Sequence, residues 1–472
     1  MRHTGRRILR RSLPTFLLLL HLLPLYAQRD STASALRIHG VTITGNKVTR
    51  EPIILRELLV REGESLGLAD FYERTERSRQ NLMNTGLFNT VTVLPLFLNA
   101  TSVIVEVVVN ERWYWWPGLI FQLADPNFNT WWLTRDLDRV NYGVRSYRYN
   151  FRGRNETLHA VAQFGYTQQF ALQYKVPYVD RRQRWGITVG GGFEQQAEVT
   201  SGTVDNKRIL LRNPDGPNRT ERWGSLELTL RRAHDIRHYW RAGYMDAEVT
   251  DTVVQRSADY FDGDALRTRY FSLGYGLVWD RRDNRAFPRK GHYAEVRIDR
   301  WGLGVGGEAE PDITTLYATA KRWWVLGERW TAALSLRGRV TQGTPPYYVQ
   351  EGLGYSAQVR GYEYYVADGE HFTMGRANVL FTLFRPRSYR LEAVPMESFR
   401  TLHLALYLNV YTDVGRVWDS RYAAQNSLSD QWQRGHGLGV DLVTSYDQVV
   451  RFEYSINALG EHGSFLHFTQ PF

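Results

Sequence analysis

Two patterns of hydrophobic and polar positions divide the chain near residue 112. Between residues 36 and 112, apolar residues follow the two-residue period of strands in some stretches and the wider spacing of helices in others. From Trp113 to the end, the helical spacing disappears and apolar and polar residues alternate. The pattern predicts a small α+β domain followed by an all-β region.

The first region predicts the order strand, helix, helix, strand, strand. The expected elements are a strand around residues 41–43, a helix after Thr49, a helix at about 68–84, and strands at 88–94 and 102–109. Thr49 is expected to cap the first helix, because a threonine hydroxyl can accept a hydrogen bond from the first turn. The valine-rich last strand has one apolar face that suits a small core.

The clearest alternation in the second region is TLHLALYLNVYTDVG, residues 401–415. One face is apolar and consists of Leu402, Leu404, Leu406, Leu408 and Val410. The other face consists of His403, Ala405, Tyr407, Asn409, Tyr411 and Asp413. A strand with an oily and a polar face is typical of a transmembrane barrel, whose closure leaves no backbone group unpaired in lipid.

Similar alternating segments begin at about sixteen places between Trp113 and Phe465, an even number as bacterial barrels require. The predicted fold is therefore a transmembrane antiparallel barrel of about sixteen strands. A soluble β-sandwich is the alternative, but it does not explain leucine-rich faces opposite polar ones.

Composition agrees with strands as the membrane-crossing elements. The 472 residues include 15 Trp, 28 Tyr and 40 Gly, and only 43% are hydrophobic. After the N-terminal segment no stretch reaches the roughly 18 consecutive apolar residues of a membrane-spanning helix. Cysteine is absent, which excludes disulfides and thiolate zinc sites.

The N-terminal segment predicts a secretory signal peptide over residues 1–27. A basic stretch up to Arg11 precedes an apolar core, and Ala27 offers a cleavage site. A membrane anchor is the alternative, but His21 and Pro24 interrupt a core that is too short to span a bilayer. The expected mature domains are residues 36–112 and 113–472.

Charge and motifs argue against nucleic-acid binding and catalysis. The formal net charge is +10, but Arg and Lys are scattered and part of the excess lies in the signal segment. Residues 302–307 match a dinucleotide fingerprint formally, yet they lie between two predicted strands without a following helix. We therefore expect no enzyme, no cofactor and no metal site.

A long connection carries the strongest candidate for a functional residue. About thirty residues separate the strands that begin near Arg329 and Met374, and they include SAQVRGYEYY, residues 356–365. Loops of this length are usually functional or disordered, and the tyrosines favour packing. If Arg360 enters the lumen it needs a carboxylate, and alternation places Asp413 on the polar face.

These stretches resemble the BamA/TamA superfamily. Residues 36–112 resemble its POTRA domain, in Ser78-Arg79-Gln80, Leu82, Gly86-Leu87-Phe88 and Val91. Val359-Arg360-Gly361-Tyr362 resembles the motif of its sixth extracellular loop, and Tyr411-x-Asp413-x-Gly415 resembles the partner motif on strand thirteen. The resemblance implies that the loop folds into the barrel, where Arg360 is latched to Asp413.

One position departs from the family pattern. The family often carries a glutamate on strand twelve in a pattern like Asn-x-Glu, whereas this chain has Asn378-Val379-Leu380. We therefore expect Asp413 to hold Arg360 with one acid fewer.

Further matches extend over the barrel. Asp280, Asp283, Asn284 and Gly291 resemble the family's periplasmic hairpin. Residues 434–439 and 451–454 resemble its late strands, and Phe472 resembles the terminal aromatic of its barrel-recognition signal.

The first and last strands, which must meet to close the barrel, both contain proline, at Pro117 and Pro471. Proline donates no backbone hydrogen bond, so one hypothesis is a seam that opens. The alternative is that both prolines lie at the interfacial ends of their strands.

The resemblance implies a protein of the bacterial outer membrane with its POTRA domain in the periplasm. The expected partners are the lipid bilayer and unfolded or extended polypeptides, which add to the POTRA sheet edge. Periplasmic or lipoprotein partners are also expected candidates, and nucleic acid is not. The expected role is polypeptide insertion or translocation, and the alternatives are a two-partner secretion pore and a passive channel or scaffold barrel.

Overall fold

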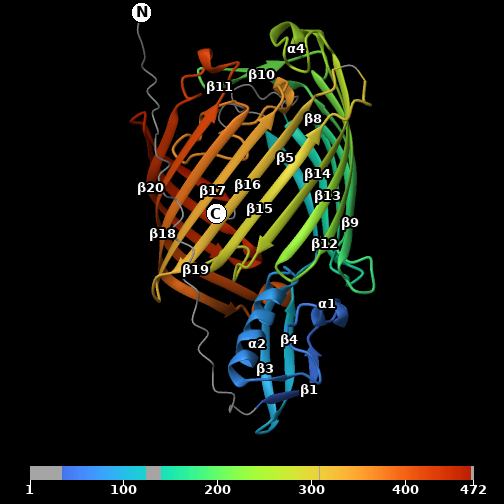
Figure 1. Cartoon of the computed structure of the whole chain (residues 1–472), viewed down its shortest axis with the longest axis vertical. Helices are drawn as coiled ribbons and strands as arrows, with labels where there is room; N and C mark the ends of the chain where they lie inside the picture. The colour runs from blue at the N-terminus through green and yellow to red at the C-terminus, as the bar shows by residue number, and fades with distance from the viewer. Residues whose placement is uncertain (1–34, 124–139, 308, 469–472) are drawn as a thin grey trace, which may run out of the picture.

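The computed structural model describes residues 35–123, 140–307 and 309–468, and shows a small α+β domain below a large antiparallel barrel (Figure 1). The predicted fold class is confirmed. The signal peptide expected at residues 1–27 lies outside the described residues. None of the helices described is both long and apolar enough to cross a membrane.

The first domain consists of β1 (Leu36–Thr44), α1 (Glu51–Leu55), β2 (Ser65–Leu66), α2 (Leu68–Met83), β3 (Phe88–Asn99) and β4 (Ser102–Glu111). Its sheet has the order β2-β1-β4-β3, with β1 and β4 parallel and β3 at one edge. Phe71 and Leu82 of α2 are fully buried in one core with Val103, Val105 and Val107 of β4. The two-residue strand β2 was not predicted, because it is too short to show a period.

The prediction that Thr49 caps the first helix is wrong. The N-cap of α1 is Arg50, and it makes no side-chain capping hydrogen bond. The hydroxyl of Thr49 instead lies 3.1 Å from the hydroxyl of Tyr114 and accepts a hydrogen bond from Nδ2 of Asn150 at 2.8 Å. The hydroxyl of Thr49 therefore forms a tertiary contact with the barrel instead of the N-cap hydrogen bond that local propensity predicts.

Sixteen strands form one continuous antiparallel sheet, which confirms the predicted number. They are β5 (Trp115–Leu123), β6 (Val140–Phe151), β7 (Glu156–Gly165), β8 (Thr167–Val176), β9 (Trp185–Gln196), β12 (Arg219–Arg231), β13 (Ile236–Val249), β14 (Arg267–Asp280), β15 (Gly291–Trp301), β16 (Ile313–Val325), β17 (Trp330–Gln342), β18 (His371–Arg390), β19 (Thr401–Trp418), β20 (Trp432–Thr444), β21 (Val449–Asn457) and β22 (His462–Phe468). Each strand pairs with its neighbours in chain order, apart from the insertion between β9 and β12.

The two faces of β19 follow the alternation in its sequence. Asn409, Tyr411 and Asp413 are buried on the lumen side, whereas Leu408 and Val410 are exposed on the outside of the barrel. The register of the neighbouring strands places their polar positions toward the same lumen.

The seam between β5 and β22 differs from the other strand boundaries. No ladder joins residues 115–123 to residues 462–468 in the part of the chain that the structure describes. Leu119 and Phe121 of β5 are 89% and 72% exposed, more than Leu408 of β19 at 40%. Among the described residues, both edges of the sheet are therefore unpaired at this place.

The end of the barrel farthest from the first domain is covered by a hairpin that the sequence analysis missed. The strands β10 (Glu198–Val204) and β11 (Lys207–Arg212) pair with each other and not with the barrel, and they lie above it with helix α4 (Asp251–Arg256) (Figure 1). Thr203 contacts Tyr347 through their hydroxyls at 3.1 Å, and Asn206 donates through Nδ2 to Ser427 at 2.9 Å. The hairpin therefore fastens two long loops.

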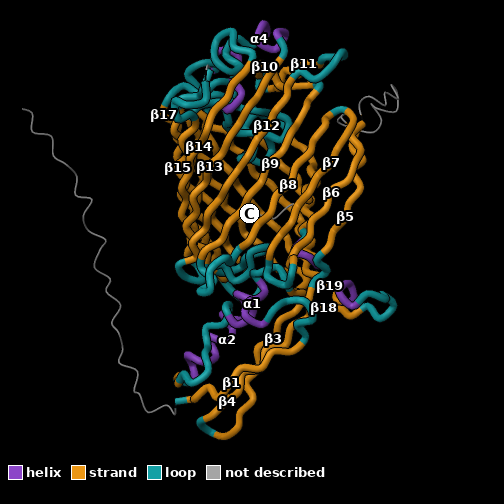
Figure 2. Tube along the Cα trace, turned by 90° about the vertical axis from the view of Figure 1, so that its right-hand side faces the viewer, coloured by secondary structure: helices purple, strands orange, loops and turns teal. Residues whose placement is uncertain are grey.

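The opposite end is in contact with the first domain. The strands β18 and β19 continue below the barrel beside β3, and helix α5 (Glu397–Arg400) lies at their tip (Figure 2). Six turns of the barrel touch residues 36–112, through Asn150, Tyr178, Arg231, Arg285, Ser398 and Asp447. These contacts fix the domain across the mouth of the barrel.

Candidate functional site: the lumen latch and the domain junction

The connection between β17 and β18, residues 343–370, folds into the barrel instead of projecting from it. Leu353, Val359 and Tyr362 of this loop are buried in one cluster with Phe372 and Val417 of the barrel wall. Apolar packing of this kind holds the loop in a single place and orders the arginine at its centre.

Arg360 makes five hydrogen bonds to the wall of the lumen. Its backbone N–H and Nε donate to Oδ2 of Asp413 at 3.2 and 2.8 Å, and Nη2 donates to Oδ1 at 2.5 Å. Nη2 also donates to Oδ1 of Asn378 at 2.8 Å, and Nη1 donates to Oε1 of Glu453 at 3.2 Å. All four residues are buried, so the charges compensate one another where water does not reach.

The aromatic ring of Tyr411 completes the cage around the arginine. The guanidinium carbon of Arg360 lies 3.7 Å from the ring centroid, within the range of a cation–π contact. The hydroxyl of Tyr411 lies 2.5 Å from the hydroxyl of Ser455, which fixes the plane of the ring.

Glycines on the wall leave room for the loop. A Cβ on Gly415 would lie 2.6 Å from Cγ2 of Val359, and a Cβ on Gly435 would lie 1.8 Å from the carbonyl oxygen of Arg360. Gly361 itself has a φ of +92°, a conformation that favours glycine after the arginine. Both the loop motif and the strand motif thus need small residues for a close approach of two backbones.

The structure adds a carboxylate that the sequence analysis did not assign. Leu380 brings no charge and packs instead with Phe287 and Tyr407 in an apolar cluster. Glu453 of β21 supplies the second acid, so the expectation that Asp413 acts with one acid fewer is not met. The alternation of Arg451, Glu453 and Ser455 on the lumen face was the available signal for it.

Two further arginines join the same network. Nε of Arg376 lies 3.4 Å from Oδ2 of Asp413, and Arg451 pairs with Asp441 at 2.5 Å and reaches Glu453 at 3.5 Å. Three arginines including Arg360 therefore face three carboxylates, and removal of any one leaves an uncompensated charge.

The hairpin between β14 and β15 is organised by its own polar residues. The carboxylate of Asp280 accepts hydrogen bonds from Arg282 and Arg285, at 2.8 and 2.9 Å. Oδ1 of Asp283 accepts from the backbone of Asn284 at 2.9 Å, and Oδ1 of Asn284 accepts from two later backbone N–H groups. Gly291 follows with a φ of +112°, where a Cβ would strike the carbonyl of Arg281.

This hairpin also binds the first domain. The backbone N–H of Arg285 donates to Oδ1 of Asn84 at 2.9 Å, and Nδ2 of Asn84 donates to the carbonyl of Asp283 at 3.3 Å. Asn84 follows α2 directly and is its C-cap residue. The turn motif therefore positions a docking surface in addition to shaping the turn.

Glu57 forms an ion pair between the domain and the barrel. It is 1% exposed, and Nη1 and Nη2 of Arg231 donate to its two oxygens at 2.5 and 2.7 Å. Burial raises the pKa of this carboxyl, but attraction to Arg231 and the hydrogen bonds from it outweigh burial and lower the pKa from its ordinary value. Glu57 therefore stays ionised at the junction.

A cluster of aromatic and charged side chains joins the two sides of the seam at the same end. Arg112 donates to both carboxylate oxygens of Asp447 at 2.6 and 3.1 Å, and the ring of Trp116 lies 5.1 Å from that of Tyr446. Phe399 packs against the same two rings.

One of the two seam prolines lies in a described strand. Pro117 lies within β5, opposite Ser146 of β6. Pro471 and Phe472 lie outside the described residues.

No group of three or more His, Asp or Glu side chains in the described part of the chain is arranged to hold a metal ion. Residues 302–307 follow β15 in a loop, where Leu303 and Gly306 donate backbone hydrogen bonds to Glu310.

A barrel of this kind, with a small α+β domain across its mouth, defines an outer-membrane protein of the POTRA-barrel class. Residues 150–459 match the Omp85 superfamily domain, and residues 36–112 match the POTRA domain described as surface antigen variable number repeat. The chain belongs to the Omp85 superfamily, and the resemblance to the BamA/TamA type is confirmed. It is an outer-membrane protein with its POTRA domain in the periplasm.

Solved structures share the fold at low sequence identity. BamA from Haemophilus ducreyi lacking POTRA domains 1–3 aligns with a TM-score of 0.51 and 13% identity, over 92% of this chain and 83% of that one. CdiB from Escherichia coli aligns with a TM-score of 0.54 and 12% identity, over 93% of this chain and 75% of that one. No curated protein sequence matches the chain.

Proposed function

We propose that this protein receives polypeptides on its POTRA domain and inserts them into, or moves them across, the outer membrane. The action is non-enzymatic and needs no cofactor. The observation that carries the proposal is the free edge of β3, which borders the sheet on one side and can accept an added strand. Leu94, Leu96, Phe97 and Leu98 are exposed along its second half and offer apolar contacts to a client.

Pro95 limits where a client strand can add. It lies in the middle of β3 and supplies no backbone N–H to a partner strand. Proline within a sheet is typical of edge strands for this reason. The start of β3 is already engaged, because Nδ2 of Asn89 donates to the carbonyl of Ser398. Residues 96–98 are therefore the part of the edge that is both free and apolar among the described residues.

A binding measurement on the whole protein tests the proposal. Unfolded segments of outer-membrane barrels should bind the wild-type chain, and Phe97→Asp should weaken this binding because it places a charge on the apolar edge. Asp70→Asn, at the start of α2, is the control for a change of charge elsewhere in the domain. Failure of any polypeptide to bind, or equal binding by Phe97→Asp, would count against the proposal.

The bare edges of β5 and β22 support an opening of the barrel wall as the route into the membrane. Proline at position 117 weakens the first strand as a pairing partner, in keeping with an openable seam. Pairs of cysteines introduced along positions 117–121 and 464–468 would crosslink incompletely if the seam opens. Quantitative crosslinking along the whole length would instead favour prolines that merely end their strands.

Client preference separates this role from its alternatives. A two-partner secretion pore would bind one dedicated exoprotein and ignore unfolded barrel segments. A passive channel or scaffold would bind neither.

A further inference from the structure

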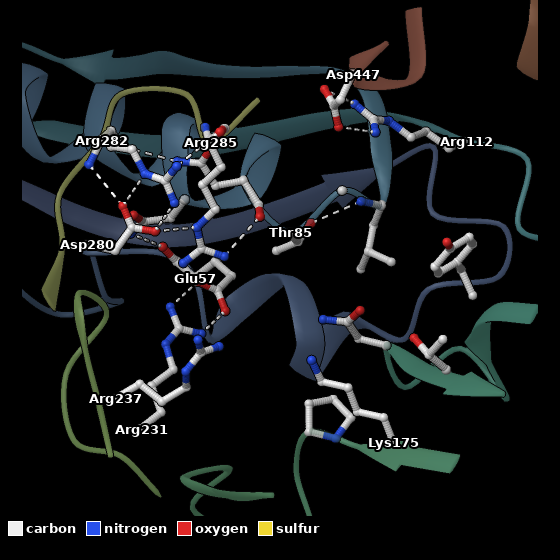
Figure 3. A pocket seen from close by; sticks show the side chains of 18 of the residues that line it. Glu57, Thr85, Arg112, Lys175, Arg231, Arg237, Asp280, Arg282, Arg285 and Asp447 are labelled. Atoms are coloured by element: carbon white, nitrogen blue, oxygen red, sulfur yellow. Dashed lines mark hydrogen bonds and ion pairs between the residues drawn. The ribbon is translucent and has the colours of Figure 1, made fainter. Parts of the chain in front are cut away.

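A large cavity lies where the POTRA domain meets the mouth of the barrel. Its volume is about 1060 Å³, and side chains from α2, from the strand ends and from the periplasmic turns line it (Figure 3). Aromatic side chains, including Trp116, Tyr147 and Tyr293, line it together with charged ones. The space exceeds the needs of a small ion and is of the size that takes an organic ligand or a stretch of peptide.

The carboxylates around this cavity are already neutralised. Each of them lies within ion-pair distance of an arginine, and the set consists of Glu57, Glu227, Asp235, Asp280 and Asp447. Asp280 is shared by Arg282 and Arg285, so one negative charge serves two positive ones. The acidic groups thus offer little to a cationic ligand.

Several basic groups around the same cavity lack a carboxylate. Among the described residues, no ion pair is formed by Arg77, Lys175, Arg184 or Arg237, all of which line the cavity. Lys175 and Arg237 line the cavity and are exposed, and repulsion of Lys175 by Arg237 and Arg285 is only partly offset by its attraction to Glu227. In Figure 3 no marked interaction reaches Lys175. An anion that enters would relieve this crowding.

Arg77, on the POTRA side of the cavity, is also a basic group without an ion-pair partner among the described residues. Burial and then the nearby Arg281 lower the pKa of this guanidinium, while Asp235, Asp280 and Asp283 act in the opposite direction. Its Nη1 donates to Gln80 and to the carbonyl of Arg282.

We propose that this cavity binds an acidic segment of an extended polypeptide, with Lys175 and Arg237 as its main charge partners. This inference rests on the proposed function and names the chemistry of the client segment that passes from the POTRA domain toward the barrel. Carboxylates would pair with the free cations, and the aromatic walls would contact the intervening apolar side chains.

Two fluorescent peptides of equal length and equal apolar content test the inference on the full chain in lipid nanodiscs. One peptide carries Asp and Glu, and the other carries Lys and Arg at the same positions. The acidic peptide should bind more tightly, and its affinity should fall as salt is added because exposed charges are screened. The double variant Lys175→Gln and Arg237→Gln should lose about tenfold in affinity for it.

The control removes an equivalent charge outside the cavity. Lys290→Gln lies in the same periplasmic hairpin as Arg285 but does not line the space, and it should bind the acidic peptide as the wild type does. The heat-dependent mobility of the barrel on a gel establishes that each variant is folded.

Four results would overturn the inference. If both peptides bind equally, or if the double variant binds normally, the cavity is not selective for acid while polypeptide binding by the protein stands. Displacement of the acidic peptide by inorganic phosphate beyond the effect of matched salt would assign a small-anion site instead. If neither peptide nor any unfolded barrel segment binds, the proposed function fails together with the inference.

Discussion

One arginine–carboxylate contact holds the loop of residues 343–370 in the lumen, and another holds the POTRA domain at the mouth of the barrel. The two contacts differ in their access to water. Arg360 lies inside the lumen with its side chain 6% exposed, and it meets two carboxylates, an amide and an aromatic ring. Arg231 lies at the periplasmic mouth with its side chain 21% exposed, and Glu57 is its carboxylate partner. A charge that loses its partner in the lumen stays dry, whereas one at the mouth can be hydrated. The burial of each ion pair, more than its hydrogen bonds, therefore determines how much the pair contributes to stability.

The largest effect is expected when the lumen contact is broken. Asp413→Asn removes the main partner of Arg360 and leaves its buried guanidinium with Glu453 as the remaining carboxylate partner. Loss of one member of a buried pair costs about 3–5 kcal/mol, so the loop of residues 343–370 should detach from the wall. Limited proteolysis of the folded barrel should cut this loop much faster than in the wild type.

Glu328→Gln is the matched control for that experiment. Glu328 pairs with Arg385 at 2.5 Å, but its side chain is 85% exposed. The variant should leave the loop protected, since exposed pairs contribute little. Equal cleavage rates for Asp413→Asn and the wild type would show that Arg360 is not a latch.

A smaller effect is expected at the mouth. Glu57→Gln replaces charged hydrogen bonds to Arg231 with neutral ones, which should weaken docking of the POTRA domain by about 1.5–3 kcal/mol. Spin labels on the POTRA domain and the barrel should then report a broader distance distribution. Glu64→Gln, which affects a pair within the POTRA domain, should leave the distribution unchanged.

The same contact predicts a dependence on pH. Because docking lowers the pKa of Glu57, its contribution is fully present above the ordinary value of 4.5 and is lost as the pH falls through the lowered pKa. The spin-label distances should therefore broaden under acid in the wild type. In Glu57→Gln this part of the acid transition should be absent, and its persistence would assign the transition to other groups.

The smallest effect is expected from the aromatic member of the lumen cage. Tyr411→Leu removes the cation–π contact with Arg360 and should loosen the loop by about 0.5–2 kcal/mol. Tyr411→Phe keeps the ring and loses only the contact with Ser455. The rate of loop cleavage should fall in the order Asp413→Asn, Tyr411→Leu and Tyr411→Phe. Any other order would contradict a larger contribution from the charged contact than from the aromatic ring.

The sequence predicted the barrel wall well because each strand carries its own two-residue period. The faces of residues 401–413 could be assigned without knowing any neighbour, since the pleat is a local property. The pairing of Arg360 with Asp413 was expected from motif resemblance together with this alternation, and the two side chains are in contact.

Contacts that depend on the path of the sheet could not be predicted in the same way. Glu453 reaches Arg360 only because β19, β20 and β21 pair in a particular register. The contact of Glu57 with Arg231 joins residues 174 positions apart, through a turn and a domain orientation that no local pattern encodes. The β10–β11 hairpin was missed because its strands are short, and because Ile209, Leu210 and Leu211 follow one another without alternation.

The ion pair between Arg112 and Asp447 has a consequence for how the wall can part. Arg112 lies three residues before Trp115, where the first strand of the barrel begins, and Asp447 lies in the turn before the second-last strand, so this contact bridges the two sides of the seam at their periplasmic end. Separation of β5 from β22 there must stretch or release it. By thermodynamic reciprocity, a client that draws the POTRA domain away lowers the work of parting the strands, and strands that have parted loosen the domain by the same free energy.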